Sequence, residues 1–188
     1  MIILYYSIII YLLYSVYLIG CNQKKIFFDD SVIELKIKGY GYMNILSNEY
    51  NNLPNKIFIN GINKTVQKIY YFENSENNIY NVSLMWISFI NPSFSNMFKG
   101  CSNITEIDFF NFDTSEMNDI DSMFEGCTSL THLNLSTLNT CNIYKFDYMF
   151  RNCSSLISLN LSNFDVSRAS GFDAIFLRLF IFEIFRFV

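Results

Sequence analysis

The chain of 188 residues has a single histidine, His132, and its 7 glycines never form a G-x-G-x-x-G run. The 5 cysteines include no C-x-x-C pair. Metal centres in proteins are commonly built from clustered cysteines and histidines, and phosphate-binding loops from glycine-rich turns. We therefore predict no resident metal, no cofactor and no enzymatic activity.

Basic residues are also scarce. Charged residues make up 16% of the chain, and the formal net charge is −4. Residues 97–174 carry 4 Lys and Arg against 10 Asp and Glu, whereas the rest of the chain has a small positive excess. Because a nucleic-acid binder needs a clustered basic face, we expect no nucleic acid among the partners.

Charge is missing altogether from residues 2–20, IILYYSIIIYLLYSVYLIG. An uncharged run of about 20 residues is long enough to span a bilayer as a helix, and secretory signals occupy the same place in a chain. The sequence LIGC at 18–21 resembles a lipoprotein processing box, which makes Cys21 a candidate lipidation site. We predict an apolar helix that serves as a signal peptide or a membrane anchor, with a buried helix as the alternative. The expected location is the cell surface or the exterior, with the chain tethered to a membrane through residues 2–20.

What the sequence does contain is an internal repeat that occurs three times. MFKGC, MFEGC and MFRNC begin at Met97, Met123 and Met149, 26 residues apart. Each is followed in register by the pattern L-x-x-L-x-L-x-x-L/F, whose central alternation has the period of a strand. Stacked copies would join their strands into a parallel sheet and their apolar side chains into one core. The expected core residues are Cys101, Cys127, Cys153, Ile107, Leu133, Leu159, Phe109, Leu135 and Leu161.

The cysteine column, Cys101, Cys127 and Cys153, has three interpretations. Cysteine often packs as a small buried hydrophobe, which is the favoured one. A disulfide between neighbouring repeats is geometrically conceivable, but it would leave one cysteine unpaired. Metal binding is disfavoured because no histidine column accompanies the cysteines.

A second column, Asp113, Asn139 and Asp165, follows the last core residue of each repeat. Short side chains of this kind bond to following backbone amides and fix turns, which is the favoured interpretation. Calcium binding is the alternative, suggested by nearby acidic residues that occur in one repeat only.

The segments around the repeats complete the predicted organisation. SVIELKIK alternates like a strand, and Asn60-Gly61 between two apolar runs predicts a type I′ hairpin turn. Residues 175–188 lack the MFxxC opening, which indicates either a truncated product or an apolar edge that binds a partner. The expected parts are 1–21 as signal or anchor, 22–78 as a β-rich cap, and 79–188 as repeats, divided into a degenerate coil 79–96, intact repeats 97–122, 123–148 and 149–174, and a truncated coil 175–188.

The three copies, with GCTSLTHLNLS, NFDTS and SMFEGC, resemble the BspA-like leucine-rich-repeat surface proteins, whose 26-residue units also occur in mycoplasma-type and listerial lipoproteins. The resemblance is strong over residues 97–174 and weak over 79–96. It implies a curved repeat solenoid with one short parallel strand per coil, displayed outside the cell for adhesion or other binding. It supplies no catalytic residues.

We therefore expect non-catalytic recognition of a protein or glycan ligand by the outward face of the sheet. The predicted face consists of Glu106, His132 and Ser158; Asp108, Asn134 and Asn160; and Phe110, Ser136 and Ser162. Two alternatives stay open, a structural surface-coat component and a secreted hydrolase that uses His132 with Ser158 and Glu106.

Overall fold

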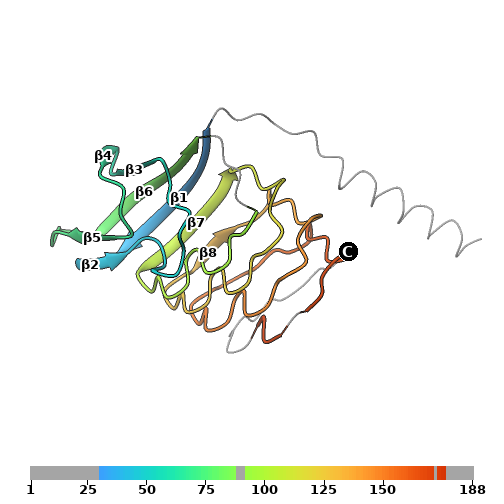
Figure 1. Cartoon of the computed structure of the whole chain (residues 1–188). Coiled ribbons are helices and arrows are strands. Elements are labelled where there is room, and N and C mark those ends of the chain that lie inside the picture. Colours follow the sequence, from blue (N-terminus) through green and yellow to red (C-terminus); the bar gives the residue numbers. More distant parts are fainter. Residues whose placement is uncertain (1–29, 88–91, 172, 177–188) are drawn as a thin grey trace, which may run out of the picture.

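Two sheets organise the part of the chain that the computed structural model describes, residues 30–87, 92–171 and 173–176 (Figure 1). The larger sheet has six strands in the order β4-β3-β6-β1-β7-β8, and the smaller one pairs β2 with β5. The strands are β1 (Asp30–Lys38), β2 (Gly41–Asn44), β3 (Lys56–Ile59), β4 (Ile62–Lys64), β5 (Ile69–Phe72), β6 (Ile79–Ile87), β7 (Ile104–Asn111) and β8 (His132–Asn134).

Strand β1 lies inside the larger sheet, antiparallel to both β6 and β7. Its alternating residues Ile33, Leu35 and Ile37 are buried, as a half-buried strand requires. The residues between them, Glu34 and Lys36, therefore face outward. This strand brings charges from the start of the described chain next to the repeats.

The Asn60-Gly61 turn joins β3 to β4 as the sequence predicts. Asn60 has φ 50° and Gly61 has φ 77°, and Ile59 pairs with Ile62 across the turn. Both central residues of a type I′ turn need positive φ, which Asn and Gly tolerate best. Strand β4 forms one edge of the larger sheet, because it is the last strand in the order on this side.

The three 26-residue repeats lie side by side in register (Figure 1). The N–H of Phe98 donates to the carbonyl of Met123 at 2.9 Å, and the N–H of Phe124 donates to that of Met149 at 3.0 Å. Eight of the nine expected core residues are buried, and Leu133 is half-buried against the core. The repeats thus share one apolar interior with the strands of the larger sheet.

The predicted solenoid with one parallel strand per coil is nevertheless wrong. The described residues form a β-rich domain around mixed sheets, without a helix, in which β7 and β8 are the only strands that pair in parallel, besides isolated parallel bridges between the repeats. Residues 79–87 form β6, which is antiparallel to β1 and β3, and the described part of repeat 149–174 contains no strand. The physical reason is that β1 inserts between β6 and β7 and bonds to both, so antiparallel pairing dominates the sheet.

Both chain ends lie largely outside the described residues. These ends include residues 1–29, with the predicted apolar helix and Cys21, and most of the predicted truncated coil 175–188. Within the described ranges, the structure has no helix long and apolar enough to span a bilayer.

The cysteine column is buried and carries free thiols. The thiol of Cys127 donates to the carbonyl of Phe98 at 3.1 Å, and that of Cys153 donates to the carbonyl of Phe124 at 3.0 Å. Each of these two sulfurs therefore bonds to the backbone of the preceding repeat, and no disulfide joins the three cysteines.

The acidic and amide column closes turns, as predicted. Side-chain oxygens of Asp113, Asn139 and Asp165 accept hydrogen bonds from backbone N–H groups two residues further on, at 3.0, 3.1 and 2.9 Å. This arrangement is the Asx turn that short polar side chains favour.

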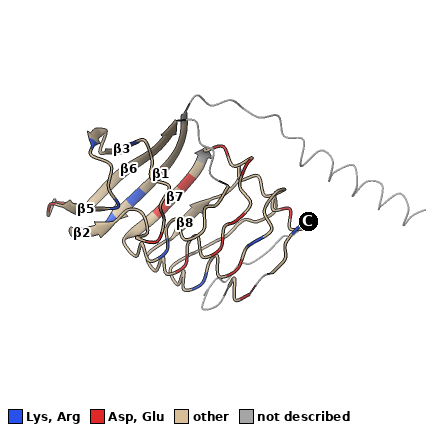
Figure 2. Ribbon diagram, in the orientation of Figure 1, with Lys and Arg blue, Asp and Glu red and all other residues tan. Residues whose placement is uncertain are grey.

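One surface column alternates in charge. The carboxylate of Glu125 lies 3.7 Å from the ammonium of Lys99 and 3.3 Å from the guanidinium of Arg151, each one repeat away. Blue and red segments accordingly follow one another across the stacked repeats (Figure 2). Opposite charges in neighbouring repeats thus favour the observed register.

The fourth letter of MFKGC, MFEGC and MFRNC is explained by backbone geometry. Gly100, Gly126 and Asn152 have φ of 73°, 74° and 62°, in the left-handed region that Gly and Asn tolerate. A Cβ at Gly126 would lie 3.6 Å from Gly100, an ordinary contact. The constraint at this position is therefore conformational and not steric crowding.

Replacing Gly126 with Val should lower the free energy of unfolding by about 1–2 kcal/mol, because a β-branched residue is strained at positive φ. Gly126→Asn is the matched control. Its free energy of unfolding should fall by at most a few tenths of that loss, since Asn152 occupies the equivalent position. Urea unfolding of the two variants checks this, and equal losses would show that side-chain space, not backbone angle, selects Gly.

Candidate functional site

Two rows of polar side chains cross the outward face of the larger sheet from β6 through β1 and β7 to β8. Strand register produces these rows, because residues paired across neighbouring strands lie next to each other on one face. The first row is Asn81, Lys36, Glu106 and His132. The second row is Ser83, Glu34, Asp108 and Asn134.

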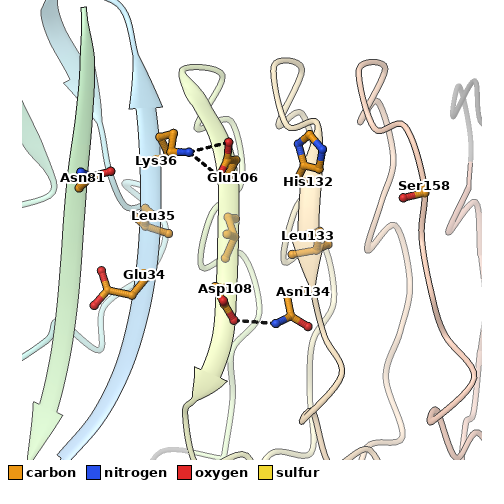
Figure 3. Close-up of a pocket in the computed structure, with 11 residues that line it drawn as sticks. Glu34, Leu35, Lys36, Asn81, Glu106, Asp108, His132, Leu133, Asn134 and Ser158 are labelled. Atoms are coloured by element: carbon orange, nitrogen blue, oxygen red, sulfur yellow. Dashed lines mark hydrogen bonds and ion pairs between the residues drawn. The ribbon is translucent and has the colours of Figure 1, made fainter.

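These rows line a hollow of about 490 Å³, which we call the sheet hollow (Figure 3). Its polar residues are those of the two rows, without Ser83 and with Ser158 added from the third repeat. Leu35, Ile107 and Leu133 lie between the two rows, and the side chains of Leu35 and Ile107 are buried in the core on the opposite face. Residues far apart in the sequence thus share one shallow site.

An ion pair between β1 and β7 fixes the first row. The ammonium of Lys36 lies 2.8 Å from each carboxylate oxygen of Glu106. The two side chains are 40% and 42% exposed, so solvent screens the pair and its effect on stability is small. Its main consequence is local, because Lys36 neutralises Glu106 and holds both side chains in one orientation.

The second row holds two carboxylates in register. Glu34 on β1 is paired directly with Asp108 on β7. The hydroxyl of Ser83 donates to Glu34 at 2.8 Å, and the amide nitrogen of Asn134 donates to Asp108 at 2.9 Å. In Figure 3 the two carboxylates point away from one another, Glu34 toward β6 and Asp108 toward β8.

His132 lies at the exposed end of β8 and bonds locally. Its Nδ1 is 3.0 Å from the hydroxyl oxygen of Thr131, and that hydroxyl donates to the carbonyl of Thr105 at 3.0 Å. The Thr131 hydroxyl thus links the imidazole of His132 to the backbone of β7.

The hypothetical catalytic residues His132, Ser158 and Glu106 all line the sheet hollow, but they are not bonded to one another as a catalytic set would be. Glu106 pairs with His132 in strand register, but its carboxylate is bound to Lys36. Within the described part of the chain, no hydrogen bond joins His132 to Ser158 or Glu106. General acid and base groups act within hydrogen-bond reach of each other and of substrate, and this geometry offers no such pair.

The other residues of the predicted face have mixed positions. Ser136 and Ser162 lie in turns after the strand row, where their N–H groups donate to the side-chain oxygens of Asn134 and Asn160 at 3.1 and 3.0 Å. Both asparagines thus fix turns in addition to facing outward. Phe110 belongs to β7, but its side chain lies outside the described residues.

Sequence reasoning missed the contribution of β1 and β6, namely Glu34, Lys36 and Asn81. Alternation of Ile33, Leu35 and Ile37 indicated which side chains face outward, but no signal indicated that β1 lies beside β7. In the ranges that the structure describes, no three Asp, Glu, His or Cys side chains are grouped so that they could hold a metal ion.

These features define a β-rich, repeat-containing protein with an open polar site on its sheet. Residues 92–184 match the model of a family described as Mycoplasma protein of unknown function, DUF285. This match covers the three intact repeats. No curated protein and no solved structure matches the chain.

Proposed function

We propose that the chain is a non-catalytic recognition protein that binds a protein or glycan ligand in the sheet hollow. The observation that carries this proposal is the pair of polar rows across four strands, held in place by the Lys36–Glu106 ion pair and the Asn134–Asp108 hydrogen bond. Side chains that are already oriented lose little freedom when a ligand binds. A shallow site of this kind suits recognition of a surface.

We further propose that the protein works at the cell surface or outside the cell, in adhesion. Support comes from the uncharged run at residues 2–20 and from the candidate lipidation site Cys21. The resemblance of the repeats to BspA-like leucine-rich-repeat surface proteins supports the same location. A membrane tether would present the sheet hollow to ligands in the surroundings.

A Ser158→Arg variant tests the binding site. Ser158 is exposed at the rim of the sheet hollow, and a long charged side chain there should obstruct it. We expect at least about 10-fold weaker binding, equivalent to about 1.4 kcal/mol. The measurement is surface plasmon resonance of the purified full chain against arrays of extracellular proteins and glycans.

Ser154→Arg is the matched control, because Ser154 is also exposed in the third repeat but does not line the sheet hollow. It should bind the same array ligands as the unmodified chain. A ligand that binds the Ser158→Arg variant and the unmodified chain equally well would place recognition elsewhere. Assembly of the purified chain into ordered layers without ligand would favour the surface-coat alternative.

A further inference from the structure

We propose that the sheet hollow selects a basic segment of a partner protein, with one lysine or arginine side chain docked between Glu34 and Asp108. This inference rests on the proposed function and specifies its ligand. Among the described residues, no element covers the outward face of β6, β1, β7 and β8. The charges on this face indicate which kind of ligand would bind there.

The charges of the sheet hollow leave a negative excess. Among the described residues that line it, Glu34, Glu106 and Asp108 are acidic and Lys36 is basic. Lys36 is engaged by both oxygens of Glu106, so this pair is internally neutral. The second row therefore presents two carboxylates. A complementary partner is cationic.

Strand register makes the carboxylate pair unfavourable in the free protein. Glu34 and Asp108 stand directly opposite each other on antiparallel strands, where like charges are destabilising. Each carboxylate turns away from the other, toward a hydroxyl of β6 or an amide of β8 (Figure 3). A cation placed between them would replace this repulsion with charge-assisted hydrogen bonds to both.

The chemistry of the site favours a basic side chain over a neutral glycan. A lysine ammonium has three donors and an arginine guanidinium has five, whereas sugar hydroxyls bring no charge to oppose the repulsion. Half-buried Leu133 can contact the methylene stem of such a side chain, whereas Leu35 and Ile107 are buried in the core.

The probe for a test is a fluorescein-labelled tetralysine peptide, with tetraglutamine as its uncharged counterpart, titrated against the full chain by fluorescence anisotropy. Tetralysine should bind and tetraglutamine should not. Glu34→Gln and Asp108→Asn should each weaken tetralysine binding by about 10-fold, the effect of a lost hydrogen bond to a charged group. Raising NaCl from about 50 to about 500 mM should weaken it as well.

Two controls separate this site from general acidity and from misfolding. Glu76→Gln removes an exposed carboxylate outside the sheet hollow and should leave the affinity unchanged. Glu34→Gln should also raise the urea midpoint of the free protein, because it removes a like-charge pair while keeping an acceptor for Ser83. A residue needed only for structure would instead lower that midpoint.

Equal tetralysine affinity of the unmodified chain and Glu34→Gln would overturn the proposal, as would equal losses in Glu34→Gln and Glu76→Gln. Binding of a chitosan tetramer, but not tetralysine, with dependence on Glu34 would overturn the choice of a protein segment. If tetralysine fails to bind while an array ligand is lost only in Ser158→Arg, the recognition function stands and this inference alone falls.

Discussion

Replacing Phe124 with Ala should lower the free energy of unfolding by about 3–5 kcal/mol, the range for removing a buried phenylalanine. Its ring is fully buried and stacks between Phe98 at 5.9 Å and Phe150 at 5.7 Å, nearly parallel to both. It also meets Phe109 edge to face at 6.1 Å. The substitution leaves a cavity in the middle of this column of rings, between Phe98 and Phe150.

Such a loss is a large share of the roughly 5–15 kcal/mol that stabilises a typical domain. Urea unfolding of the full chain, followed by far-UV circular dichroism, measures it. Ile157→Ala is the control, because Ile157 lies in the same repeat stack but is 62% exposed, and it should change stability by less than about 0.5 kcal/mol. A loss below about 1 kcal/mol for Phe124→Ala would mean that the ring column does not hold the repeats together.

The sequence was informative about which side chains enter the core. Register of the apolar letters indicated the burial of Ile107, Phe109, Leu135 and Leu161, since a repeated period places equivalent residues in equivalent surroundings. The phenylalanines of MFKGC, MFEGC and MFRNC recur with the same period, yet their stacking was not predicted. Their repetition was a usable signal, because identical aromatic residues one repeat apart occupy one column.

Strand partners were beyond reach of the sequence. The alternation in β1 indicates two faces but neither the neighbour nor the direction of pairing, and Lys36 meets Glu106 across 70 residues of chain. In the third repeat, burial was predictable but strand formation was not. Leu159 and Leu161 keep the apolar pattern and are buried, yet the described part of this repeat forms no strand. Periodicity reports the environment of side chains, whereas a strand also needs a backbone ladder.

In the site, too, some neighbours were predictable from the sequence and others were not. Glu106 and His132 were placed next to each other by the repeat period, and the structure pairs them in register. Their chemistry depends on Lys36 and Thr131, which bind the carboxylate of one and the imidazole of the other. Site residues contributed by a single repeat pattern were accessible from sequence, while their partners from β1 were not.

The buried thiols provide the second large effect, a strong resistance to alkylation. Burial raises the pKa of Cys101 and of Cys153 from 9.0 to about 12, and it raises that of Cys127 well above its ordinary value. Only the thiolate reacts with iodoacetamide. At pH 8 the folded protein should therefore label at these cysteines on the order of 1,000-fold more slowly than the urea-unfolded chain, as peptide mapping by mass spectrometry would show.

The same shift predicts how stability depends on pH. Below about pH 9 these thiols are protonated in both the folded and unfolded states, so the free energy of unfolding keeps its full contribution from their burial. As pH rises toward about 12, the unfolded state loses protons first, and the free energy of unfolding falls. Urea midpoints should drop between pH 9 and 11, and less steeply in Cys101→Ala. Rapid labelling of Cys101 and Cys153 at pH 8 without loss of structure would contradict their burial, because a thiol that reacts in the folded state must reach solvent.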